Sequence, residues 1–211
     1  EFRRVLFRSV QATDSLSPTE VKKKTYGTLF LVIAACAAPV ILSYLTYYVI
    51  KPQTRNNYGD LIDPRAYPIP DLGSTSIDGK PASLAQFHGK WILLQVDSAA
   101  CEQRCQQKLY YMRQLRLTQG KEMDRIKRVW LVTDDVPLDI GLMKQYDGTH
   151  LLRVDSQKLA AWLPVAEATT ASDHLYMIDP LGNLMMRFPK DPDANKIKKD
   201  ITRLLKASGI G

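Results

Sequence analysis

Two of the three cysteines in the chain, Cys101 and Cys105, lie four residues apart, and thiols at this spacing have a short list of possible chemistries. On a helix, residues i and i+4 share one face, so the two sulfurs would lie side by side. They could close a disulfide, exchange one with another protein, or hold a soft metal ion. A purely structural disulfide is the other interpretation, but a bond between residues so close in sequence closes a small loop and stabilises little.

The residues around the pair predict a buried strand that leads into a helix. The apolar run 91–96 precedes the cysteines, and a helical pattern over 106–119 follows them. This order predicts that Cys101 lies in the first turn of the helix, where unpaired amide groups and the positive end of the helix dipole favour a thiolate. Arg104, between the two cysteines, adds a positive charge that favours the same state.

The N-terminal part of the sequence predicts a membrane anchor. Residues 26–50 include no charged side chain, and at about 1.5 Å per residue a helix of this length crosses a hydrocarbon core of about 30 Å. Three lysines at 22–24 precede this transmembrane helix, so we expect residues 1–25 to stay in the cytoplasm and the rest to be exported. Residues 1–9 resemble the translation of a common sequencing adapter, so the fold prediction excludes them.

The third cysteine allows a different anchor. Residues 33–36 read Ile-Ala-Ala-Cys, which is similar to the lipobox of bacterial lipoproteins, in which the cysteine is lipidated after cleavage. A lipidated protein normally continues into a polar linker, whereas here the uncharged run continues to residue 50. The pattern therefore favours a transmembrane helix in which Cys36 is a small apolar residue.

The exported part predicts a linker followed by one domain. Four prolines among polar residues make 51–70 a semi-rigid tether, and the domain is expected over 71–211. Beyond the first strand and helix, the patterns predict a strand at 129–133, helices at 138–146 and 156–163, a hairpin of 175–178 with 183–188, and a last helix at 193–207. A parallel βαβ unit followed by an antiparallel hairpin and a closing helix is typical of an α/β, thioredoxin-like fold, with a central mixed sheet flanked by helices.

The charge pattern does not indicate a nucleic-acid partner. From Lys51 onward the chain has 23 basic and 19 acidic residues, and the two kinds are interspersed. Such a distribution is typical of a solvated surface.

Several segments of the exported part together resemble the Sco family. They are the segment 77–84 (IDGKPASL), the strand that begins at Trp91, the cysteine pair, and the segment 172–182 (SDHLYMIDPLG). Sco proteins are membrane-tethered thioredoxin-fold proteins that help to assemble the copper centre of cytochrome c oxidase subunit II. The resemblance covers about residues 71–207.

The resemblance implies a copper site made by Cys101, Cys105 and His174. In a thioredoxin-like fold, the position eight residues before the glycine of the hairpin turn normally holds a cis-proline packed against the dithiol; counting back from Gly182 gives His174. We therefore expect the imidazole to face both sulfurs. Two soft thiolates with one borderline nitrogen suit a single copper ion, as Cu(I) or Cu(II).

The predicted function is that of a membrane-anchored, periplasmic copper-binding protein of a bacterial inner membrane, which assists assembly of cytochrome c oxidase. Its partners would be subunit II or other oxidase assembly factors. The insert Glu102-Gln103-Arg104 lacks the prolines usual in the family, which favours an alternative: a thiol–disulfide oxidoreductase that reduces partner cysteines without metal. A third hypothesis is a catalytically silent interaction module. A peroxidase is disfavoured, because no threonine and arginine partners are apparent around Cys101.

Overall fold

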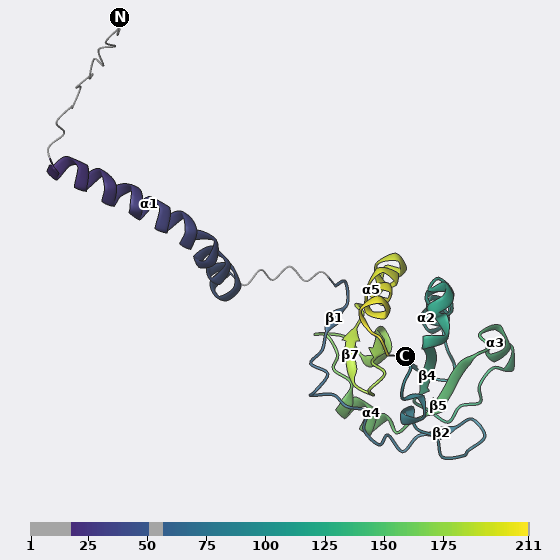
Figure 1. Ribbon diagram of the computed structural model, residues 1–211. Coiled ribbons are helices and arrows are strands. Elements are labelled where there is room, and N and C mark those ends of the chain that lie inside the picture. Colours follow the sequence, from purple (N-terminus) through teal and green to yellow (C-terminus); the bar gives the residue numbers. More distant parts are fainter. Residues whose placement is uncertain (1–17, 51–56, 211) are drawn as a thin grey trace, which may run out of the picture. The chain divides into compact units, whose positions relative to one another are not determined.

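The computed structural model describes residues 18–50 and 57–210, which belong to two compact units. The first unit is the helix α1 (Pro18–Leu45) with a π-helical turn, η1 (Thr46–Ile50) (Figure 1). The 24 residues Tyr26–Val49 have a mean hydropathy of 2.3 and are not buried. By length and composition, this part of the helix can cross a membrane. This confirms the predicted apolar helix as a candidate span. Residues 1–17, which include the predicted adapter sequence and most of the predicted cytoplasmic segment, lie outside the described residues.

The second unit is the domain that contains the cysteine pair. It consists of seven strands, four α-helices and three 3₁₀ turns in the described part of the chain. In chain order they are β1 (Asp60–Leu61), β2 (Thr75–Ser76), η2 (Leu84–Phe87), β3 (Trp91–Asp97), α2 (Gln103–Leu117), η3 (Gly120–Arg125), β4 (Ile126–Val132), α3 (Ile140–Gln145), β5 (Thr149–Arg153), α4 (Ser156–Trp162), η4 (Ala171–Asp173), β6 (Leu175–Ile178), β7 (Leu184–Arg187) and α5 (Ala194–Ala207).

The seven strands form one mixed sheet in the order β1-β7-β6-β3-β4-β5-β2. Strands β3, β4 and β5 are parallel, and β6 pairs antiparallel with β3, in the register Gln95 to Leu175. The hairpin of β6 and β7 follows, and the two-residue strands β1 and β2 pair antiparallel with β7 and β5 at the outer edges. This is the predicted thioredoxin-like arrangement, with β3 at its centre.

Helices cover both faces of the sheet (Figure 1). One face packs against α2 and α5, where Met112 and Ile201 meet Leu93 and Met177 of the strands. The opposite face packs against α4 and η2, around a second cluster that includes Tyr176. The strands are therefore buried on both sides, which explains why β3 and β4 read as continuous apolar runs.

The domain begins earlier than the sequence predicts, because part of the expected linker belongs to it. Within the predicted tether 51–70, β1 extends the sheet. The buried carboxylate of Asp200 on α5 accepts hydrogen bonds from the amides of Tyr58 (2.8 Å) and Gly59 (2.9 Å). These contacts show that the domain begins at residue 58 or earlier, and not at residue 71 as predicted. Residues 51–56 of the predicted tether lie outside the described residues.

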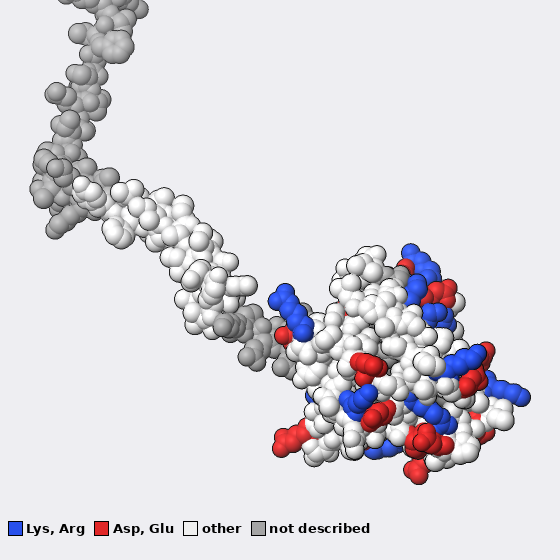
Figure 2. Space-filling model, turned by 90° about the horizontal axis from the view of Figure 1, so that it is seen from below, with Lys and Arg blue, Asp and Glu red and all other residues white. Residues whose placement is uncertain are grey.

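Charged side chains of both signs are mixed on the domain surface. Figure 2 shows lysine and arginine side chains next to aspartate and glutamate side chains across the face that it presents. The apolar helix carries no charged residue from Tyr26 to Ile50. The mixed surface agrees with the solvated surface expected from the sequence.

Candidate functional site

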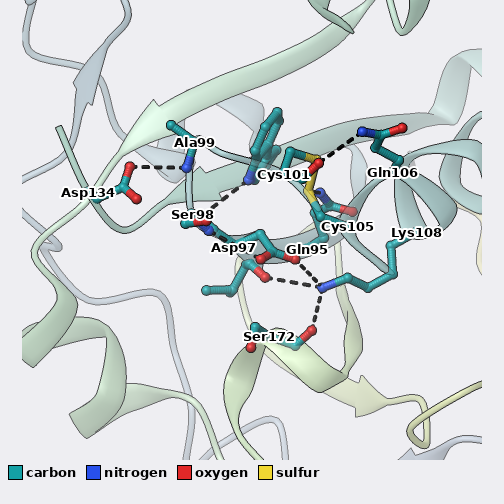
Figure 3. Close-up of a disulfide and its surroundings, with 12 residues drawn as sticks. Gln95, Asp97, Ser98, Ala99, Cys101, Cys105, Gln106, Lys108, Asp134 and Ser172 are labelled. Atoms are coloured by element: carbon teal, nitrogen blue, oxygen red, sulfur yellow. Dashed lines mark hydrogen bonds and ion pairs between the residues drawn. A yellow bond between two sulfur atoms is a disulfide. The ribbon is translucent and has the colours of Figure 1, made fainter. Parts of the chain in front are cut away.

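Cys101 and Cys105 form a disulfide at the corner where β3 leads into α2 (Figure 3). Their Cα atoms are 5.0 Å apart. The prediction that Cys101 lies in the first helical turn is wrong, because Glu102 is the N-cap and α2 begins at Gln103. Cys101 lies before the helix in the left-handed region, with φ of 39°. The third residue of the helix is Cys105.

Contacts from two distant residues and one local hydrogen bond hold the turn before the helix. The amide of Ala99 donates to the carboxylate of Asp134 (3.0 Å), and the amide of Cys101 donates to the carbonyl of Ser98 (3.2 Å). The indole of Trp130 donates to the carbonyl of Asp97 (3.4 Å). A positive φ is uncommon for a residue other than glycine, so these contacts offset a local strain at Cys101.

The disulfide is almost completely buried, but its two sides differ. Cys101 is 0% exposed and Cys105 2% exposed, and both pack into a cluster with Leu109, Trp130 and Val132. Cys105 also borders a hollow of about 200 Å³ on the surface of the domain, which Cys101 does not line. The remaining residues that line this hollow are polar: Asp97, Ser98, Glu102, Arg104, Ser172 and Asp173.

Gln95, on β3, lies directly beneath the disulfide. Its side chain is fully buried, and its amide nitrogen lies 3.4 Å from Sγ of Cys105. Its amide oxygen is also buried and has no hydrogen-bond partner among the described residues. A buried acceptor without a partner costs free energy, so its position beside a sulfur requires a reason.

Lys108 connects three segments next to the disulfide. It lies on α2 and is 6% exposed, and its ammonium group lies 2.9 Å from the carboxylate of Asp97. It also donates to the carbonyls of Val96 (3.2 Å) and Ser172. Burial lowers the pKa of Lys108, and the charge of Asp97 opposes that shift. The lysine therefore holds α2 against the end of β3 and the segment before β6.

Asp173 anchors the rim of the hollow. Its carboxylate accepts a hydrogen bond from the amide of Thr170 (3.0 Å) and lies 3.1 Å from both Arg104 and Lys190. The hydrogen bond from the Thr170 backbone is the main reason that the pKa of Asp173 falls to about 2, while burial opposes the shift and Lys190 adds to it. This carboxylate is therefore more stable as an anion in the folded domain than in the unfolded chain.

An Asp173→Asn variant should lose about 2 kcal/mol of folding free energy at pH 7. The pKa of Asp173 lies below its unfolded value of 3.8, so its contribution is complete above about pH 4 and disappears as the pH falls through about 2. Urea unfolding, followed by tryptophan fluorescence, should show that the difference in free energy of unfolding between wild type and variant falls towards zero as the pH is lowered from about 4 to about 2. Asp191→Asn is the control, because Asp191 is 71% exposed. A difference that persists at pH 2 would contradict the assignment.

The ring of His174 is buried, and both of its nitrogens have partners. Nδ1 lies 2.8 Å from the carbonyl oxygen of Phe188, and Nε2 lies 2.7 Å from the hydroxyl of Thr169. Burial lowers the pKa of His174, which favours the neutral ring. A carbonyl only accepts, so Nδ1 donates to Phe188. The hydroxyl of Thr169 lies 2.7 Å from both Nε2 and the carbonyl oxygen of Ala166, and its single proton can go to only one of them.

The strand pattern places this ring on the opposite face of the sheet from α2. Leu175 and Met177 pack in the cluster that includes residues of α2, whereas Tyr176 packs in the cluster on the other face. His174 has an extended backbone (φ −117°, ψ 156°) and its ring meets Tyr176 edge-on, at 6.0 Å between centroids. Side chains alternate along extended chain, so His174 shares the face of Tyr176, and Ser172 and Asp173 border the hollow instead.

Residues 91–208 match the family described as transmembrane-like, thioredoxin-like, C-terminal domain. The chain belongs to this family. The match covers the strand, the cysteine pair, the hairpin and the last helix, so the site described above lies inside the family's domain. A comparison with curated protein sequences gives no match.

Solved structures with the same fold include Sco proteins and a putative protein disulfide isomerase. A SCO1/SenC family lipoprotein from Bacillus anthracis is 19% identical, with a TM-score of 0.52, over 69% of this chain and 99% of that one. Yeast Sco1 with copper bound is 15% identical, with a TM-score of 0.53, over 66% and 95%. A putative protein disulfide isomerase from Bacteroides thetaiotaomicron is 19% identical, with a TM-score of 0.51, over 71% and 94%. The resemblance to Sco proteins that the sequence predicts is confirmed, because this chain and the Sco structures share one fold.

The predicted copper ligands of this thioredoxin-like domain do not fit a copper ion as they are arranged here. Cys101 and Cys105 are bonded to each other, and the ring of His174 lies on the face of the sheet opposite α2, with Nε2 2.7 Å from the hydroxyl of Thr169. Among residues 18–50 and 57–210, no group of three or more histidine, cysteine, aspartate or glutamate side chains could hold a metal ion. The structure brings the two cysteines together but does not add the imidazole.

Two residues of this site were not predicted from the sequence, namely Gln95 and Lys108. Gln95 is the one polar residue within the apolar run 91–96 of β3. This interruption of the run could have identified Gln95 as a site residue. Lys108 lies one turn after Cys105 on the same helical face, but a lysine at such a position is usually solvated. Its burial depends on Ser172, which is 64 residues away in the sequence.

Proposed function

We propose that this chain is a membrane-anchored thiol–disulfide oxidoreductase that exchanges its Cys101–Cys105 disulfide with the cysteines of client proteins. The observation that supports this most is the disulfide at the corner of β3 and α2, with one of its cysteines bordering a polar hollow at the surface. A bond needed only for stability has no use for such an opening, whereas exchange requires a sulfur that another sulfur can reach.

The buried amide beside the pair supports the same chemistry. Opening the disulfide produces a thiolate, and positive groups and amide donors stabilise it. The amide of Gln95 points at the sulfur of Cys105, whereas the guanidinium of Arg104 is paired with Asp173 and Asp191. The Gln95 amide lowers the cost of separating charge during exchange.

The proposed location of the exchange is the periplasm of a bacterium, with α1 spanning the inner membrane. The lysines at 22–24 support this orientation, because cytoplasmic flanks of membrane helices are enriched in basic residues. In an oxidising compartment, a cysteine pair is either a disulfide or a managed redox site.

The reduction potential of the pair tests the proposal. The full chain in detergent micelles, with Cys36→Ser so that only one pair remains, would be equilibrated with mixtures of oxidised and reduced dithiothreitol. We expect one two-electron transition above about −300 mV, because structural disulfides typically lie below that value. The same chain should catalyse disulfide exchange in a cystine-containing peptide, and the chain that also carries Cys101→Ser and Cys105→Ser should not. A lower potential without catalysis would identify a structural bond.

Copper delivery to cytochrome c oxidase subunit II is the second candidate function. It is favoured by the segment that carries His174, since the two residues before it border the same hollow as Cys105. The disulfide would have to be reduced and Nε2 released from Thr169. Copper titration of the reduced chain separates the candidates: under the first proposal, Thr169→Val and His174→Ala leave copper uptake unchanged. Tighter uptake in Thr169→Val, lost when His174→Ala is added, would favour copper delivery.

A further inference from the structure

We infer that Arg128 forms the base of a binding site for a small phosphate-like oxyanion, between α2 and the turn that follows α3. The inference does not depend on the proposed function, because the site is remote from the cysteine pair. Strands β3 and β4 are parallel, with Trp91 opposite Ile126, and the cysteines follow the end of β3. Arg128, near the start of β4, therefore lies towards the other end of the sheet.

The guanidinium of Arg128 is buried without a counter-charge. Arg128 is 5% exposed, and its neighbours on the same side of β4, Ile126 and Trp130, pack in the clusters on the α2 face of the sheet. Nη2 donates to the carbonyl of Asp147 (2.5 Å). Among the described residues, Nε and Nη1 have no partner, and no ion pair joins the group to a carboxylate. A buried cation without a counter-charge is costly, so an anion at this position would stabilise the domain.

A second buried group without a partner lies beside Arg128. Thr149, on β5, is the register partner of Arg128, and the side chains of paired residues project from the same face of a sheet. Leu151, two residues further along β5, packs against the cluster that includes Trp130, which places Thr149 on the α2 face as well. Oγ1 of Thr149 is buried and has no partner in the part of the chain that the structure describes. This hydroxyl can donate its proton to the same ligand that accepts from Arg128.

Two further guanidinium groups reach the same region from α2. Arg113 is exposed and donates to the carbonyl of Gln145 (3.2 Å), two residues before the carbonyl that Arg128 contacts. Arg116 donates through Nε to the carbonyl of Ile126 (3.1 Å), two residues before Arg128 on β4. Because Arg113 is held only by a carbonyl at the surface, its side chain can leave that oxygen and join Arg128 on a bound anion.

The charges of these three arginines favour an anion over a neutral ligand. Arg116 pairs with Asp124 (2.8 Å), which is 79% exposed, and Arg113 makes no ion pair with any described residue. Burial is the main cause that lowers the pKa of Arg128; the charges of Arg116 and Arg113 lower it further, and Asp147 opposes the shift. A water molecule would supply an acceptor for the free donors, but only an anion also offsets the charge.

The donors identify the chemical class of the ligand. Nε and Nη1 of Arg128, the guanidinium of Arg113 and the hydroxyl of Thr149 all donate, and guanidinium groups match the geometry of oxyanions. A donor set of this size suits the four oxygens of a phosphate better than the two of a carboxylate. Because the donors of Arg128 are buried, we expect a free anion and not a lipid headgroup at a bilayer surface.

Titration with inorganic phosphate tests the site. The full-length oxidised chain in detergent micelles would be titrated calorimetrically with sodium phosphate, at an ionic strength held constant with sodium chloride. We expect one site per chain, and Arg128→Met should weaken binding at least about tenfold, because it removes a charged donor. Thr149→Val keeps the shape of the side chain and removes a hydroxyl without a partner, so it should weaken binding about threefold without loss of stability. Arg65→Met is the control, since Arg65 is exposed and the change in net charge is the same.

Thermal unfolding of the same chains gives a second measurement. A ligand that binds the folded chain raises its Tm, so phosphate should raise the Tm of wild type and of Arg65→Met above the chloride control, but not that of Arg128→Met. No phosphate-specific shift in wild type would overturn the inference and indicate that Arg128 is only hydrated. Equal affinities in wild type and Arg128→Met would also overturn it, since the phosphate would then be an adventitious ion only. If Arg128→Met does not fold, an unchanged affinity in Thr149→Val overturns the inference and a weaker one supports it.

Discussion

Replacing Lys108 with methionine is expected to lower the free energy of unfolding by about 3–5 kcal/mol. Methionine is close to lysine in length, so the change mainly removes the ammonium group. The carboxylate of Asp97 then loses its partner at 2.9 Å, and the carbonyls of Val96 and Ser172 lose their donor. Leaving a mostly buried charge without its partner is more costly than losing the attraction itself. Urea unfolding followed by the fluorescence of the three domain tryptophans measures the loss.

The double variant Asp97→Leu with Lys108→Met separates the two parts of this cost. Removing both charges leaves no unpaired ion, so we expect it to be more stable than Lys108→Met alone. Lys121→Met is a control, because Lys121 is 90% exposed and exposed ion pairs contribute little. A double variant no more stable than the single one would show that packing of the lysine side chain, not the charge of Asp97, sets the cost.

The contribution of Lys108 to folding stability changes with pH in a direction that its pKa shift defines. Its pKa is lowered in the folded domain, so the unfolded chain binds the proton more tightly between the folded pKa and 10.5. Wild-type stability relative to Lys108→Met should therefore rise with pH within that interval.

His174→Ala is expected to lower the free energy of unfolding by about 3 kcal/mol. The molecules that remain folded should exchange disulfides as fast as wild type. The substitution leaves a cavity beside Tyr176 and takes away the donor to the Phe188 carbonyl and the ring nitrogen that lies 2.7 Å from the Thr169 hydroxyl. Stability is measured by urea unfolding, and exchange by reaction with oxidised glutathione after reduction of the pair.

His150→Ala is the matched control, since His150 is exposed and should lose far less stability. The contrary outcome is also informative. A His174→Ala chain that is as stable as wild type, but whose reduced form no longer retains copper, would show that the ring serves a metal rather than the fold.

The sequence predicts those parts of this molecule that depend on local periodicity. Ile197 and Ile201 recur at helical spacing, and α5 is found where they indicate it. The apolar runs of β3 and β4 and the turn residues of the β6–β7 hairpin identify the sheet. The cysteine pair itself was predicted from its spacing, and the structure closes it as a disulfide.

The remaining features depend on contacts between residues far apart in the sequence. The helix begins after Cys101 because Asp134, 35 residues from Ala99, holds the preceding turn. Tyr58 belongs to the domain because Asp200, 142 residues away, accepts its amide hydrogen. The orientation of His174 follows from the register of β6 against β3, and a shift of one residue would turn the ring to the other face. No local pattern contains this information.

The short strands β1 and β2 have a consequence for how partners bind. Each is two residues long, and they form the two outermost positions of the sheet. An extended peptide that joined the sheet as an eighth strand would find a template of only two residues on either side, and so brief an edge also discourages self-aggregation. Under the proposed function, side-chain contacts around the sulfur, instead of main-chain pairing, would therefore select the clients.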